Sequence, residues 1–218
     1  NQEKEPFRLK YISAGPLATP ELAAEQAFDE IIHFVQISRN GLGYAKQAIS
    51  ADAKHFDELR EKLVKYEEIS DRIEYEIAAF LNGVSAGDIS EATSMKIKAM
   101  YKIIGELESL GDSGEAISRM LSRRNEHKKT FSAETIDNIN LMLEKVDIAY
   151  EVMIANLTAA HEGTLSSIAN AYQAEEQINV LRNELREAEI EALEDNDKNY
   201  QTSVYYIDII NELEHMGD

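Results

Sequence analysis

The sequence predicts an all-α protein of six long antiparallel helices, arranged as two similar three-helix bundles. Three observations lead to this prediction. The 218-residue chain has only 3 Pro and 10 Gly and is rich in good helix formers. Apolar residues recur every three or four positions along six segments, so each segment is expected to bury one stripe against partners. One ten-residue phrase is also spelled almost identically in the two halves of the chain.

The first half is expected to hold a lead-in and three helices. Residues 1–19 read as an extended linker, and Thr19 is a suitable N-cap because Pro20 follows at the first helical position. The first helix should run to about residue 51, with a kink where Gly41 and Gly43 interrupt it. The second should span about 52–81 and end at Asn82-Gly83, and the third should span about 91–124.

The second half is expected to repeat that plan over residues 132–218, so that residues 20–124 form the first three-helix unit. Ser132 is the predicted N-cap of the fourth helix. Residues 162–164 break the pattern, a fifth helix should span about 165–193, and a sixth should begin near Asn199. We expect the sixth helix to be cut short at Asp218.

The internal repeat is the strongest evidence for two similar units. Ile103–Asp112 (IIGELESLGD) and Ile209–Asp218 (IINELEHMGD) match at seven of ten positions, 106 residues apart. The preceding helices align at an offset of 108, which places Tyr66–Ile77 over Ala174–Leu185. Two matches in the same order at nearly the same offset indicate a duplicated three-helix unit.

The charge of the chain limits its partners. The net charge is −19, which argues against nucleic acid and against an anionic membrane surface, because both bind basic faces. Metal cations and basic protein segments are the partners that such a field favours. No apolar run approaches the length of a membrane-spanning helix, so we expect no direct membrane insertion of this segment. Cysteine is absent, which excludes disulfides and thiolate sites.

Pairs of acids four residues apart are the candidate metal ligands, because such residues share one helix face and repel each other unless a cation is present. Glu108 and Asp112 occupy the first copy of the phrase, and Glu214 and Asp218 the second. The remaining pair, Glu67 and Asp71, lies on the second predicted helix. A solvated acidic face is the competing interpretation, since the chain has 41 acidic residues.

A catalytic function is not expected. Glu212-x-x-His215 suggests a di-iron site of the ferritin-like type. However, Ser109 stands where the first copy would need the equivalent histidine, so we regard a ferritin-like metal-dependent oxidase as the least favoured alternative. The sequence also has no nucleophile elbow, P-loop or dinucleotide fingerprint.

These features together resemble the PhoU family. The resemblance rests on the duplicated three-helix unit, the phrases at 106–112 and 212–218, and the acidic segment around Glu67. The entry segment at 17–27 is similar to the stretch that joins the membrane part of bacterial Na⁺/phosphate cotransporter-like proteins to a C-terminal PhoU-like domain. The fold that the resemblance implies is a PhoU-like, spectrin-repeat-like bundle.

The resemblance implies a cytoplasmic regulatory domain of a sodium-dependent phosphate transporter, at the inner membrane as part of a membrane protein. Its implied partners are the transporter's membrane domain or other phosphate-system proteins, and a homodimer is a further possibility. A free-standing PhoU-like regulator of phosphate signalling is the alternative. Divalent metal or iron on surface carboxylates is the implied cofactor. The ligands that it nominates are Glu67, Asp71, Glu108, Asp112, Glu175, Glu214 and Asp218, with Asn179 departing from the pattern at the position aligned with Asp71.

Overall fold

The computed structural model describes residues 19–163, 167–194 and 200–217, which form six α-helices and no strand. This arrangement confirms the predicted all-α fold. The helices are α1 (Pro20–Ser50), α2 (Ala53–Ser85), α3 (Glu91–Glu126), α4 (Ala133–His161), α5 (Ala169–Glu194) and α6 (Tyr200–Gly217). The predicted lead-in lies almost entirely outside the described residues.

Side-chain caps fix the starts of the first four helices. Each capping oxygen accepts a hydrogen bond from a backbone N–H three residues further on, which satisfies one of the donors that a helix start leaves open. The predicted caps Thr19 and Ser132 are both confirmed. The four caps are Thr19 to Leu22 (3.3 Å), Asp52 to His55 (2.9 Å), Ser90 to Thr93 (3.2 Å) and Ser132 to Thr135 (3.2 Å).

Two helices differ from the sequence prediction. Helix α1 runs without a break through Gly41 and Gly43, and α2 passes Asn82-Gly83 and ends at Ser85. The reason is burial: Leu42 lies in the core beside Gly41, and Val84 is buried beyond Gly83. A glycine within a helix costs only about 1 kcal/mol relative to alanine, and burying an apolar side chain outweighs that cost.

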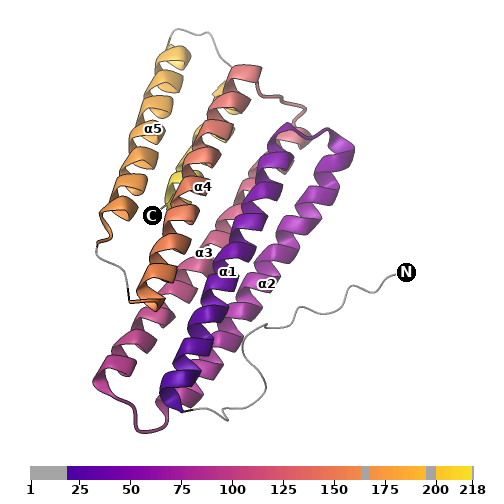
Figure 1. Cartoon of the computed structure of the whole chain (residues 1–218). Helices are drawn as coiled ribbons and strands as arrows, with labels where there is room; N and C mark the ends of the chain where they lie inside the picture. Colours follow the sequence, from indigo (N-terminus) through magenta and orange to yellow (C-terminus); the bar gives the residue numbers. More distant parts are fainter. Residues whose placement is uncertain (1–18, 164–166, 195–199, 218) are drawn as a thin grey trace.

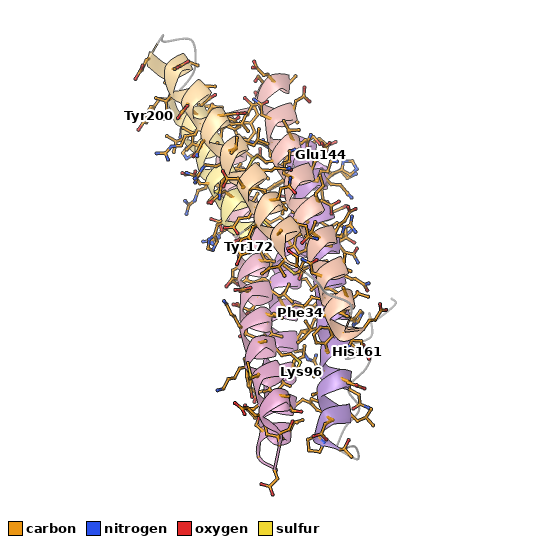
Figure 2. All side chains as sticks on the ribbon, turned by 60° about the vertical axis from the view of Figure 1, so that its left-hand side comes forward. Phe34, Lys96, Glu144, His161, Tyr172 and Tyr200 are labelled. Atoms are coloured by element: carbon orange, nitrogen blue, oxygen red, sulfur yellow. The ribbon has the colours of Figure 1, made fainter. Side chains whose placement is uncertain are left out.

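The helices form two sets of three, and two pairs of helices make the contacts between the sets. Helices α1, α2 and α3 contact one another, as do α4, α5 and α6, while α1 packs on α4 and α3 packs on α6. Helices α2 and α5 therefore lie on opposite outer sides, as Figure 1 shows. In Figure 2, Tyr200 at the start of α6 and Lys96 near the start of α3 lie at opposite ends of the molecule, as expected for antiparallel helices.

In the described part of the chain, all six helices contribute buried apolar side chains to one continuous cluster, and α5 contributes only Ile178. Helix α2 buries eight residues, whereas α5 buries only Ala174, Ile178 and Glu189. The division into separate units at 20–124 and 132–218 therefore stays a prediction. None of the described helices combines the length and the apolar character needed to cross a bilayer.

Candidate functional site: an acid cluster between α2 and α3

A glycine sets the distance between α2 and α3 at the repeated phrase. A Cβ atom added to Gly111 would lie 2.8 Å from Oγ and 3.0 Å from Cβ of Ser70, closer than real side chains approach. The second copy has the same contact, because a Cβ on Gly217 would collide with Cδ1 of Ile178. Gly217 is the repeat equivalent of Gly111, and Ile178 that of Ser70. Both copies of the phrase therefore place a glycine against the neighbouring helix, and the approach is hardest to relieve at Ser70, whose Cβ is fixed to its helix.

This close approach brings acids from α2 and α3 together. Asp71 on α2 and Glu108 and Asp112 on α3 each offer a carboxylate oxygen, and these oxygens all lie within 4.8 Å of one another. Glu108 is half-buried, whereas Asp71 and Asp112 are exposed. We call these three residues the acid cluster. Glu67 and Glu74 lie one helical turn to either side of Asp71 and flank it.

The carboxylates of the acid cluster repel one another, and burial and this repulsion together raise pKa values within and beside the cluster. Partial burial, hydrogen bonding to Asp71 and Asp112 and the charges of these two residues raise the pKa of Glu108 to about 8. Burial, and then the nearby acids Glu115, Asp112 and Asp71, also raises the pKa of Glu67. At neutral pH the cluster therefore holds a proton that a cation would displace.

Burial, followed by the charges of Asp71 and Asp112, raises the pKa of Glu74 as well. Glu115, one turn beyond Asp112, provides the contrast. Its carboxylate lies 2.8 Å from Nε of Arg119 and 3.5 Å from Nη1 of Arg60, so two guanidinium groups neutralise it. Within the described part of the chain, no lysine, arginine or histidine forms an ion pair with a member of the acid cluster.

The second half has a different arrangement at the equivalent positions. Asn179 replaces Asp71, and Arg182 replaces Glu74. Nη1 of Arg182 lies 3.4 Å from Oε2 of Glu214, the equivalent of Glu108. The guanidinium group of Arg182 therefore neutralises this carboxylate. Glu175 is half-buried, and Asp218 lies outside the described residues. Of the seven predicted ligands, the structure thus brings together Asp71, Glu108 and Asp112, with Glu67 beside them.

The histidine of Glu212-x-x-His215 lies apart from the acid cluster. His215 is exposed near the end of α6 and lines an apolar groove, and the described residues include no second group of acids and histidines close enough to share a metal ion. The geometry therefore gives no support to a ferritin-like site.

One polar contact between the halves was missed at the sequence level. The guanidinium of Arg39 on α1 binds Asp147 on α4 through two bonds, Nε to Oδ1 at 2.7 Å and Nη2 to Oδ2 at 2.9 Å. Its Nη2 also donates to Glu151 at 2.6 Å. The spacing of Asp147 and Glu151 on one helix face was a usable signal, but their partner comes from another helix more than 100 residues away.

The acid cluster has the donor chemistry of a site for a hard cation. Oxygen ligands from three carboxylates suit Mg²⁺, Ca²⁺ and Mn²⁺ better than softer metals, and two of the three are accessible to solvent. Its position on rigid helices held by the Gly111 contact fixes the spacing of the ligands. Comparisons with protein-family models, with curated proteins and with solved structures returned no match to this chain.

Proposed function

We propose that this chain is a PhoU-like regulatory domain of a sodium-dependent phosphate transporter, which acts by protein contact and binds a divalent cation at the acid cluster. The observation behind this proposal is the duplicated helix contact at Gly111 and Gly217, together with three mutually repelling carboxylates beside the first copy. The sequence features that resemble the PhoU family supply the link to phosphate transport.

The role proposed for the cation is to hold α2 and α3 together at the acid cluster. Its charge would offset the repulsion among Asp71, Glu108 and Asp112, and the proton on Glu108 would leave as it binds. The second half needs no such ion, because Arg182 supplies a fixed positive charge beside Glu214. Metal occupancy would therefore change the rigidity of the first half selectively.

Calorimetric titration with Mg²⁺, Ca²⁺ and Mn²⁺ tests the cation site. The informative variant is Asp71→Asn with Glu74→Arg, which gives the first half the residues of the second. We expect the wild-type chain to bind a divalent cation with proton release and the double variant to lose that binding. The reciprocal variant, Asn179→Asp with Arg182→Glu, gives the second half the residues of the first and should leave cation binding at the acid cluster intact.

The regulatory role needs a test that does not depend on metal. In the parent gene, coding sequence for several membrane-spanning helices upstream of residue 1 would agree with the transporter proposal. Phosphate uptake by cells that express the whole gene should then change when the acid cluster is altered. A gene with no such helices would instead favour the free-standing regulator of phosphate signalling.

A further inference from the structure

The second half has a buried cluster of polar side chains at the end of the molecule where α5 ends and α6 begins, near Tyr200 in Figure 2. Oγ of Ser203 on α6 donates a hydrogen bond of 2.7 Å to Oε1 of Glu189 on α5. Glu189 is only 5% exposed and Ser203 only 1%. Tyr206, one turn further along α6, is also buried, and burial raises the pKa of its hydroxyl to about 12. We call these three buried residues the polar cluster.

The first half fills the equivalent positions with apolar side chains. Helices α2 and α5 align at an offset of 108 residues, and α3 and α6 align at an offset of 106. The equivalent pairs are Leu81 and Glu189, Ile97 and Ser203, and Met100 and Tyr206. The three apolar members of these pairs all lie buried in the core of the first half. The polar cluster therefore takes the place of apolar core residues.

The neighbouring surface positions show the reverse exchange. Ile190 is 39% exposed and Val204 is 36% exposed, and each follows a member of the polar cluster in the sequence. Their equivalents in the first half are Asn82 and Lys98, which are both exposed. At this end, the second half therefore has polar residues inside and apolar residues outside, whereas the first half has the opposite arrangement.

This exchange should lower the stability of the second half at this end. A buried carboxylate loses its hydration, and even a well-paired one is often less favourable than apolar side chains of the same volume. Apolar side chains that remain partly exposed, such as Ile190 and Val204, contribute less hydrophobic stabilisation than the buried Leu81 and Ile97. Segments that bury few apolar groups open locally at a lower free energy than the rest of a protein.

We propose that the last turns of α5 and the first turns of α6 form a local opening device, in which the polar cluster sets how easily these turns leave the folded core. The equivalent end of the first half, packed by Leu81 and Ile97, stays closed. Elements that move when a protein binds a partner are drawn from such segments of low local stability. The device lies at the opposite end of α6 from Gly217 and is independent of cation binding at the acid cluster, so either proposal can fail alone.

Native-state hydrogen exchange of the whole 218-residue chain tests this opening, because the repeat supplies an internal reference. The amides of Arg186–Ile190 in α5 and of Ala78–Asn82 in α2 occupy equivalent positions near the ends of their helices. We expect the protection factors of the α5 amides to be about tenfold lower than those of the α2 amides. Equal protection of the two sets would overturn the proposal.

A nearly isosteric variant tests whether the polar cluster causes the opening. Glu189→Met with Ser203→Ala removes both polar groups without adding bulk, so the fold should survive, and circular dichroism checks this. We expect this double variant to raise the protection factors of Arg186–Ile190 about tenfold and to leave those of Ala78–Asn82 unchanged. Unchanged or lower protection of the α5 amides would contradict the role assigned to the polar cluster.

The matched control is Glu187→Met, at an exposed position of α5 two residues before Glu189. This variant also removes one negative charge and introduces one methionine, but it does so outside the polar cluster. The protection factors of the α5 amides should therefore stay as they are in the wild-type protein. If Glu187→Met raised them as much as the double variant does, surface charge or helix propensity would set the exchange rates, and the proposal would be overturned.

Discussion

The two halves of this protein share a helix plan and a glycine contact but differ in what surrounds that contact. In the first half, three acids converge beside Gly111 with no basic partner among the described residues, and α3 continues past them into the core. In the second, Arg182 neutralises Glu214. Among the described residues, eight of the eleven large exposed apolar side chains belong to the second half. The comparison teaches that one duplicated helix contact accommodates two arrangements of charge: carboxylates that repel one another, or a carboxylate paired with an arginine.

The largest expected effect comes from the buried leucines of the repeated phrase. Leu107 and Leu213 are repeat equivalents, and both have 0% exposure. Each Leu→Ala substitution should lower the free energy of unfolding by roughly 2–5 kcal/mol, because it removes buried methyl groups and leaves a cavity. We expect Leu107→Ala to cost more, since the groove beside α6 allows the second half to relax. Chemical denaturation measures both losses, and a larger loss for Leu213→Ala would contradict this difference between the halves.

The next largest loss of stability is expected from alanine substitution at the glycine contact between α2 and α3. Gly111→Ala should destabilise the protein by about 1–2 kcal/mol, because the new methyl group meets Cβ of Ser70, which cannot move without its helix. Gly217→Ala should be nearly neutral, because the atom that it meets is the terminal methyl of Ile178, which can rotate.

A double-mutant cycle checks the source of the Gly111 effect. Combining Gly111→Ala with Ser70→Gly should restore part of the lost stability, so the two changes should not be additive. Additive losses in denaturation experiments would mean that the helices do not approach at this pair of residues.

The acid cluster should make the stability of the metal-free protein depend on pH. Folding raises the pKa of Glu108 from 4.5 to about 8, so the folded state holds this proton more tightly than the unfolded state. The resulting stabilisation is complete below pH 4.5 and is lost as the pH rises to 8 and above.

Thermal unfolding between pH 5 and pH 9 measures this effect. Glu108→Gln should flatten the decline in Tm relative to wild type, whereas Glu144→Gln, at an exposed position of α4, should not. A divalent cation should raise Tm most at high pH if it binds the cluster. If Tm of the wild-type protein and Tm of Glu108→Gln changed equally between pH 5 and pH 9, the assigned pKa of Glu108 would be wrong.

A small loss of stability is expected when the Arg39–Asp147 contact between the halves is weakened. Arg39→Lys retains the charge but loses the two-pronged bond to Asp147, because an ammonium group cannot match both carboxylate oxygens. The side chains are about one-third exposed or more, so the loss should be at most about 1 kcal/mol. Denaturation at low and high salt checks this, with Arg72→Lys, an exposed pair within α2, as the control.

The sequence by itself determined the six helices and two of their N-caps. Apolar periodicity and the capping residues Thr19 and Ser132 are local signals, and each acts within a few residues of the chain. The wrong prediction for the end of α2 was local as well. Asn82-Gly83 is typical of a helix end, but α2 extends to Ser85 because Val84 is buried. The repeat also anticipated that Glu108 and Asp112 share a face, since the spacing of four residues fixes this.

Only the tertiary structure decided which faces meet. The convergence of Asp71 with Glu108 and Asp112 depends on the approach of two helices at Gly111, a distance that no local pattern encodes. The same holds for Arg39 and Asp147, which are 108 residues apart, and for the groove, which four helices line. Helix formation depends on neighbouring residues in the chain, whereas sites and surfaces depend on packing between distant ones.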